Sequence, residues 1–285
     1  MSKTPKLHDE ISTCKGEKSI ILGNGFGRSY DVASGEDNFS WTNLLGLCDI
    51  IDRNAPVYKL LEQCHFDFEL AHQKLNNAID VISEYDSENE LISRLQEQVQ
   101  YLRSQLIIAV GNSHPSSFRR QSGEKGKEAE KIEKMVTTCR NFLNQFDCVF
   151  SLNYDLLLYW VRCFRSSLGR DSFEKVEDEL VFSPDENASY LFPHGALFLY
   201  RNGMSAVKSG TPILKKVQSN IENGIFPMCI SEGTGEQKLE AIKSNSYLLF
   251  AYERIKKCKG TIFTFGCSFV SPQYSGVKSY SGLHK

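Results

Sequence analysis

The sequence lacks the features that mark several specialised classes of protein. Its 33 basic and 35 acidic residues leave a net charge of -2, so no overall field would hold the chain on nucleic acid or on an anionic membrane. The N-terminal residues are polar and lack the apolar stretch of a secretory signal. No run reaches the ~18 apolar residues that a membrane span needs, and no internal repeat is evident. We therefore expect a cytoplasmic protein that partners neither a membrane nor nucleic acid.

Cysteine pairs are also missing, although the chain has nine cysteines. None of them forms a C-x-x-C pair, which argues against a zinc ribbon and against a thioredoxin-like redox site. An H-E-x-x-H pattern is absent as well, so we expect no metal site. An odd, scattered set of thiols is typical of proteins in a reducing cytoplasm.

The chain does have enough apolar material for a full core, because hydrophobic residues make up 41% and charged residues 24% of the composition. Residues 19–22 and 148–152 are short apolar runs that we predict to be buried strands. Between them, residues 57–143 carry apolar side chains at helical spacing, with a polar break at 83–89. A strand, a helical stretch and a second strand require a crossover connection, and therefore a parallel sheet.

We accordingly predict an α/β fold with a Rossmann-like parallel sheet. It forms one domain over residues 1–285, with a helical insertion at 57–143 and an irregular tail at 270–285. Residues 114–131 are rich in Ser, Gly, Lys, Arg and Glu, which predicts an exposed and mobile loop. The other expected elements are a helix at 155–164, strands at 189–192, 196–200, 226–230 and 261–265, and a helix capped by Thr234 and Gln237.

A glycine-rich turn, Gly23-Asn24-Gly25-Phe26-Gly27, follows the first predicted strand. Backbone N–H groups in such a turn can approach a pyrophosphate at the N-terminus of a helix. The turn departs from the G-x-G-x-x-G fingerprint, and no strand ends in an acidic residue about 20 residues later, so a dehydrogenase is not indicated. An ordinary tight turn is the alternative interpretation.

The segment Asn153-Tyr154-Asp155 follows the second predicted strand directly. One interpretation is that Asn153 or Asp155 caps the helix expected there. The other is that Asn153 offers its amide to a ribose hydroxyl or a water. The two roles are compatible, because Asp155 can cap the helix while Asn153 faces a ligand.

His194 lies between Pro193 and Gly195, in a turn flanked by two apolar runs. A lone histidine is more often structural than catalytic, but a neutral imidazole held in such a turn can accept a proton from a hydroxyl or a water near pH 7. No comparable setting surrounds the histidines at positions 65, 72, 114 and 284.

Taken in order, the motifs GNGF, LNYD, PHG and a late FG-x-S turn resemble the sirtuin-like domain of bacterial NAD hydrolases. The match spans residues 19–269, and an F-P-x-x-x-S-E-G-T segment at 226–234 is similar to that of an uncharacterised bacterial branch. The resemblance implies that NAD is bound as substrate without a metal. It assigns Gly23, Asn24, Gly25 and Phe26 to the cofactor loop, Asn153 and Asp155 to the nicotinamide ribose, His194 to the general base, and Gly266 and Ser268 to the adenosine side.

The function implied by this resemblance is cleavage of the nicotinamide-ribose bond of NAD, since relatives in this group are antiviral effectors that deplete NAD. Two departures matter. The cysteine pairs that hold zinc in deacylating sirtuins are missing, so protein deacylation is not expected. After residue 269 the family continues with an acidic residue and further elements, whereas the tail here is polar and rich in turns, as expected of a shortened C-terminus.

Two other functions stay open at this stage. The same pocket could serve a non-catalytic sensor of NAD or ADP-ribose, in which the helical insertion passes occupancy on to a partner. Alternatively, the chain could be an unrelated α/β protein whose turns mimic the motifs. In each case the long amphipathic helices leave apolar surface uncovered, so we expect a homo-oligomer.

Overall fold

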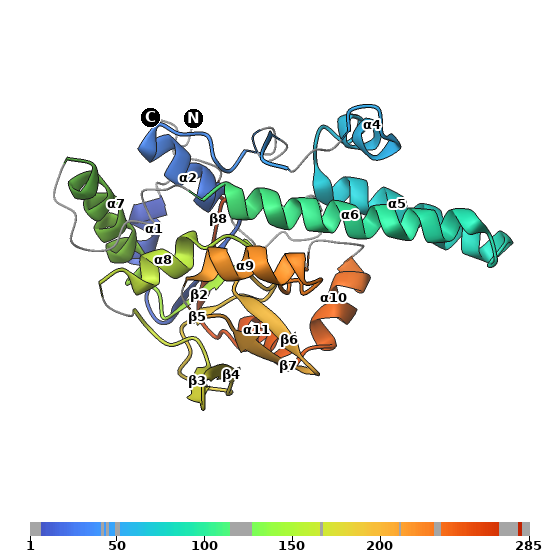
Figure 1. Cartoon of the computed structure of the whole chain (residues 1–285). Coiled ribbons are helices and arrows are strands. Elements are labelled where there is room, and N and C mark those ends of the chain that lie inside the picture. Colours follow the sequence, from blue (N-terminus) through green and yellow to red (C-terminus); the bar gives the residue numbers. More distant parts are fainter. Residues whose placement is uncertain are drawn as a thin grey trace, which may run out of the picture.

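The structure of the chain is a computed structural model that describes residues 7–40, 43, 46–48, 52–114, 127–165, 168–210, 212–230, 235–267 and 279–280. Helices surround a parallel sheet, and a smaller antiparallel sheet lies beside it (Figure 1).

The parallel sheet confirms the predicted fold class. Its strands are β1 (Lys18–Leu22), β2 (Cys148–Ser151), β5 (Tyr190–Leu191), β8 (Thr261–Phe265) and β9 (Ser279–Tyr280), in the order β5-β2-β1-β8-β9. Every neighbouring pair is parallel. The chain first builds outward from β1 through β2 to β5 and later returns to the other side of β1 with β8. The order of strands therefore reverses beside β1, which is where ligands bind in open Rossmann-like sheets.

The central strands form because their side chains are apolar on both faces. Ile20 of β1 pairs with Val149 of β2 on one side and with Phe263 of β8 on the other, and all three side chains are buried. Burial on both faces is the normal environment of a strand in a parallel sheet. Helices α1 (Leu7–Thr13), α2 (Gly25–Ser34), α7 (Lys127–Leu143), α8 (Leu157–Cys163) and α11 (Ser246–Lys256) lie around this sheet (Figure 1).

The helical pattern at 57–143 is also confirmed. Helices α4 (Pro56–Gln63), α5 (Phe68–Tyr85), α6 (Glu90–Asn112) and α7 occupy it, and the polar break lies between α5 and α6. Asp67 caps α5 by accepting from Leu70 N, and Asn89 caps α6 by accepting from Leu91 N. Helices α5 and α6 pack as a hairpin whose turn projects away from the sheets (Figure 1).

The sequence analysis does not predict a second, antiparallel sheet, although it predicts one of its strands. It contains β3 (Phe173–Val176), β4 (Glu179–Phe182), β6 (Leu199–Asn202) and β7 (Ser205–Lys208), in the order β3-β4-β7-β6. The strand expected at 196–200 therefore begins three residues later and belongs to this second sheet. Helices α9 (Ile213–Glu222) and α10 (Gly235–Lys243) follow it in the chain.

Two predictions about local structure are wrong. Residues 226–230 do not form a strand, because they make a single bridge, between Cys229 and Gly195, and Pro227 has no N–H to donate to a ladder. The exposed loop expected at 114–131 is contradicted at both ends, because His114 is buried and residues 127–131 begin α7. The predicted capping residue Thr234 and the segment 115–126 lie outside the described residues.

The tail contributes one element within the described residues, the two-residue strand β9, which pairs with β8. In the part of the chain that the structure describes, no helix is both long and apolar enough to cross a membrane.

Candidate functional site

Three of the predicted motifs meet at the carboxyl end of the parallel sheet. The N–H of Gly23 donates to Phe265 O (2.9 Å) and the N–H of Gly25 donates to Gly266 O (3.0 Å), which joins the loops after β1 and β8. The side-chain amide of Asn153 donates to Gly23 O (3.0 Å), which joins the loop after β2 to the same place. These hydrogen bonds confirm the prediction that GNGF, NYD and GCS lie at one edge.

The glycines are required here by backbone contact. A Cβ on Gly25 would overlap the backbone of Gly266, and Gly266 itself has a φ of +66°, in the left-handed region that favours glycine. The N–H groups of Gly25 and Phe26, at the start of α2, already donate to Gly266 O and Gly23 O. Asn24 is exposed between these residues. The assignment of this loop to a cofactor phosphate stays a prediction.

Asp155 lies one residue before Leu156, the N-cap residue of α8, and its side chain still satisfies an N–H of the first turn, as the capping interpretation expects. Its Oδ1 accepts from Leu157 N (2.8 Å) in the first turn of α8, and the side chain is only 7% exposed. Burial raises the pKa of Asp155 to about 6, against the lowering effect of its hydrogen bonds with Leu157 N and with the Asn153 side chain. Asn153, whose amide lies next to this carboxyl group, is only partly buried.

His194 follows β5, and because β5 pairs in parallel with β2, its turn lies at the same edge of the sheet as Asn153. The backbone holds this turn: His194 O accepts from Ile230 N (2.8 Å), and Gly195 packs against Met228 with a φ of +83°. Burial, reinforced by the charge of Lys238, lowers the pKa of His194 to about 4. The imidazole is therefore neutral at pH 7, and the same shift makes it a weaker proton acceptor than an ordinary histidine.

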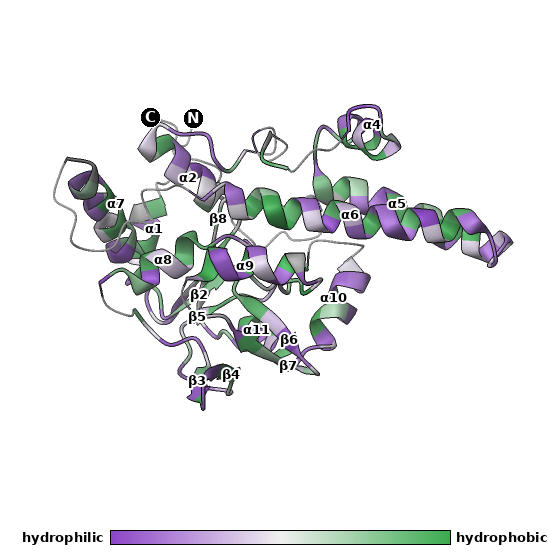
Figure 2. Cartoon of the chain, viewed as in Figure 1, coloured by the Kyte–Doolittle hydropathy of each residue, from purple (hydrophilic) through white to green (hydrophobic). Residues whose placement is uncertain are grey.

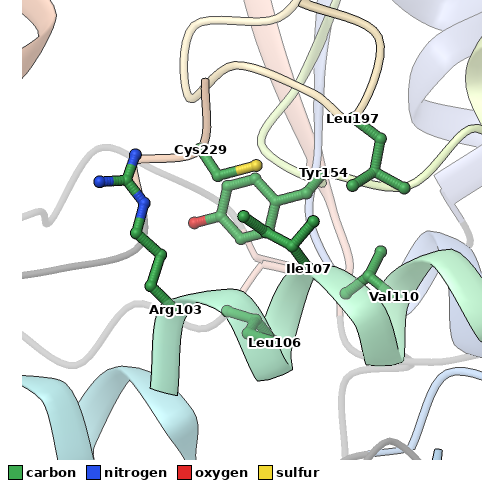
Figure 3. A pocket seen from close by; sticks show the side chains of 7 residues that line it. All are labelled: Arg103, Leu106, Ile107, Val110, Tyr154, Leu197 and Cys229. Atoms are coloured by element: carbon green, nitrogen blue, oxygen red, sulfur yellow. The ribbon is translucent and has the colours of Figure 1, made fainter. Parts of the chain in front are cut away.

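Helix α6 packs directly on the loops that carry Asn153 and His194. Four side chains of its second half line a small cavity together with Tyr154, Leu197 and Cys229, as Figure 3 shows: Arg103, Leu106, Ile107 and Val110. Leu197 N donates to Tyr154 O (2.9 Å) and the Tyr154 hydroxyl donates to Ile230 O (2.8 Å), so the two loops are also bonded to each other. The cavity measures about 10 Å³, close to the space of one water molecule.

Sequence reasoning missed His114, which lies just beyond the C-terminus of α6. It is 3% exposed, and its Nε2 accepts a hydrogen bond from Leu156 N (2.7 Å). Leu156 is the residue that follows Asp155 in the chain. The apolar helical spacing of the residues before it was the available signal, because that spacing places position 114 at the end of a packed helix and not in a polar loop.

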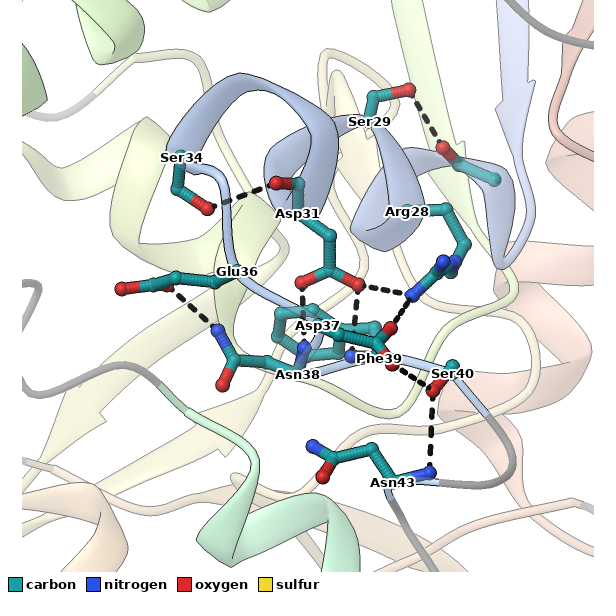
Figure 4. A network of polar contacts seen from close by, with 11 residues as sticks. Arg28, Ser29, Asp31, Ser34, Glu36, Asp37, Asn38, Phe39, Ser40 and Asn43 are labelled. Atoms are coloured by element: carbon teal, nitrogen blue, oxygen red, sulfur yellow. Dashed lines mark hydrogen bonds and ion pairs between the residues drawn. The ribbon is translucent and has the colours of Figure 1, made fainter.

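A second unpredicted feature is the polar network after α2, drawn in Figure 4. The carboxylate of Asp31 is buried and accepts from Asn38 N (2.9 Å) and Phe39 N (3.0 Å). Arg28 pairs with Asp31 (2.6 Å) and also with Asp37. This network fixes the loop that returns from α2 toward the end of α6.

The remaining predicted site residue, Ser268, lies outside the described residues. Within the described part of the chain, no three side chains of the kinds that bind metals are grouped together.

No curated protein matches the chain. Residues 20–275 match a family described as a domain of unknown function, DUF4917, and this stretch includes every site residue named above. Because the match covers most of the sequence, the chain belongs to the DUF4917 family.

Proposed function

We propose that the chain binds NAD at the carboxyl edge of the parallel sheet and cleaves the bond between nicotinamide and its ribose. The observation that carries the proposal is the meeting of the Asn153, His194 and Gly23–Phe26 loops beside the reversal in strand order. Nicotinamide and ADP-ribose would be the products. By resemblance to the sirtuin-like NAD hydrolases, antiviral defence in a bacterial cytoplasm would be the setting.

In this proposal the site has little bond-breaking work to do, because nicotinamide is already a good leaving group. Asn153 holds a ribose hydroxyl or the attacking water, and the neutral His194 accepts the proton that the water loses as it bonds to the ribose carbon in place of nicotinamide. The positive charge that develops on the ribose resembles that in other glycosidic cleavages. Gly25 and Gly266 let the two loops approach the dinucleotide backbone closely, and Asp155 keeps Asn153 in place. By the family resemblance, Ser268 would also contact the adenosine side.

We infer that α6 moves aside when NAD binds, because α6 packs on the loops next to the proposed site. A dinucleotide needs a cleft of some hundreds of Å³, far more than the cavity of about 10 Å³ between α6 and the loops. The same contact favours a second candidate function, a sensor of NAD or ADP-ribose. Binding in that case displaces the insertion, and the displacement is the output.

We also propose that the chain forms a homo-oligomer through the α5–α6 hairpin. Val81, Tyr85 and Leu91, near the turn of the hairpin, are large apolar side chains that are exposed to solvent. Figure 2 shows apolar residues continuing along both helices into the part that projects from the sheets. Packing against a second copy would cover them.

The enzymatic proposal is tested by incubating the purified chain with NAD and separating the products. We expect Asn153→Ala and His194→Ala each to lower the rate, His194→Ala by about 10²- to 10⁴-fold as for the loss of a general base. Asn144→Ala is the matched control, because Asn144 is an exposed amide before β2, at the opposite edge of the sheet. Equal rates for wild type and His194→Ala would overturn the assignment of the base.

The sensor is distinguished by calorimetry with NAD and with ADP-ribose. If wild type binds either nucleotide but releases no nicotinamide, the sensor replaces the enzyme. If it neither binds nor cleaves, both proposals fail.

A further inference from the structure

We propose that His114, which ends the helical insertion, is a positioning residue for the loop that carries Asn153 and Asp155. As a statement about catalysis this rests on the proposed function, whereas the link between His114 and the loop can be tested without it. The proposal adds a residue that none of the motifs contains, from a part of the chain that looks like a linker in the sequence.

The start of α8 is held by two side chains from different parts of the chain. Asp155, at the start of the helix, accepts from Leu157 N, and His114 accepts from Leu156 N at 2.7 Å. The first N–H groups of a helix lack partners within the helix, and a nearby side chain or water usually satisfies them. In this case one acceptor comes from 42 residues earlier, just beyond the end of α6.

The hydrogen bonds of the imidazole fix its protonation. Nε2 accepts from Leu156 N, so it carries no proton in this arrangement, and the proton of the neutral ring lies on Nδ1, 3.3 Å from Gly111 O. His114 therefore bridges the last turn of α6 and the first turn of α8. Replacing it with a side chain that cannot accept a hydrogen bond leaves a buried N–H without this partner.

Packing makes the bridge rigid. The ring meets Trp160 of α8 edge to face, with centroids 5.0 Å apart, and meets Phe39 in the same way at 5.9 Å. Phe39 belongs to the loop whose backbone Asp31 holds (Figure 4). Three segments, the insertion, the loop after α2 and the start of α8, thus meet on one side chain.

The consequence is that the position of the insertion sets the position of the site. Any movement of α6 that withdraws His114 removes the hydrogen-bond acceptor of Leu156 N. Leu156 is next to Asp155 in the chain and three residues from Asn153. Because Asn153 reaches Gly23 O through a single hydrogen bond, a shift of the α8 start alters where its amide points. Small displacements of this kind can cost about 10²-fold in rate.

The test compares His114→Leu, which fills the space but cannot accept, with His114→Gln, whose amide oxygen can. His72→Leu is the control, because His72 is an equally buried histidine of the insertion, on α5. We expect His114→Leu to lower kcat for NAD cleavage roughly 10- to 100-fold, with His114→Gln within a few-fold of wild type. His72→Leu should leave kcat unchanged. Loss of kcat in His114→Gln equal to that in His114→Leu would overturn the proposal.

A readout without activity separates this proposal from the proposed function. Amide hydrogen exchange of Leu156 should be faster in His114→Leu than in wild type, and should return to the wild-type rate in His114→Gln. This holds whether or not the wild type cleaves NAD. Unchanged exchange of Leu156 in His114→Leu would refute the positioning role. If the exchange rates follow this pattern in a protein that does not cleave NAD, only the enzymatic proposal is refuted.

Discussion

Asp155 combines a cap with a buried carboxyl group, and the two have opposite effects on its ionisation. Its pKa in the folded chain is about 6, above the ordinary value of 3.8, because burial outweighs the hydrogen bonds that it accepts. A raised pKa means that protonation favours the folded state. This contribution to stability is complete below about pH 4 and is lost as the pH rises through 6.

Asp155→Asn should therefore gain stability relative to wild type as the pH rises. The asparagine oxygen can still accept from Leu157 N, but it carries no charge to bury. We expect the difference in unfolding free energy, variant minus wild type, to grow between pH 4 and pH 7 by roughly 3 kcal/mol at most. Urea unfolding at several pH values measures it. A difference that does not change with pH would show that the carboxyl group does not titrate in this range.

The site residues that the sequence predicted are those placed by strand ends. Asn153 and Gly23 follow apolar runs directly, and parallel strands necessarily present their carboxyl ends together, so the meeting of these two residues needs no knowledge of helix packing. His114 could not be found in this way. Its contact with Leu156 N depends on where the end of α6 lies relative to the start of α8, and no local pattern in the sequence encodes that distance.

At the scale of elements, a buried ionic cluster attaches the antiparallel sheet to the rest of the fold. Arg162 of α8 and Lys208 of β7 both contact one oxygen of Asp171, at 2.8 and 2.6 Å, and all three side chains are buried. Arg162 also donates to the carbonyl groups of Leu168 and Gly169. One carboxylate thus compensates two cations between a helix and a strand.

Asp171→Ala should be among the most destabilising single substitutions, because it leaves two buried cations without their anion. We expect a loss of about 3–5 kcal/mol in the free energy of unfolding. Glu186→Ala is the control, since Glu186 is mostly exposed and its pair with Arg254 (3.2 Å) should contribute less than about 1 kcal/mol. Chemical denaturation of both variants provides the comparison. Similar losses for the two would contradict the role of the cluster.

The sequence signals also explain which elements were predictable. The strands β1, β2 and β8 are apolar runs, and α5 and α6 have clear helical spacing, so both were anticipated. Strands β3 and β4 have mostly exposed or half-buried side chains and include charged residues, so they gave no such signal. Residues 226–230 carry a misleading signal. This apolar run packs on the His194 turn, and in sequence it cannot be distinguished from a buried strand.

At the scale of the whole molecule, the α5–α6 hairpin has two different halves. Toward the sheets its helices are buried, through Ala71 and Leu75 of α5 and through Leu102 and Leu106 of α6. Toward the turn, Val81 is 59% and Tyr85 90% exposed, although they lie four residues apart on one side of α5. Apolar side chains aligned in this way are typical of a face that packs on another helix.

We therefore predict that the chain is not a monomer and that this face of α5 holds the copies together. Light scattering at micromolar concentration should give a multiple of 32.3 kDa for wild type. The double variant Val81→Lys and Tyr85→Lys should shift the mass toward 32.3 kDa, because two charges at the centre of an apolar contact would have to be buried. Val176→Lys, at an exposed apolar position on β3, should leave the mass unchanged. A single 32.3 kDa species for wild type would refute the prediction, and an unchanged multimer in the double variant would place the interface elsewhere.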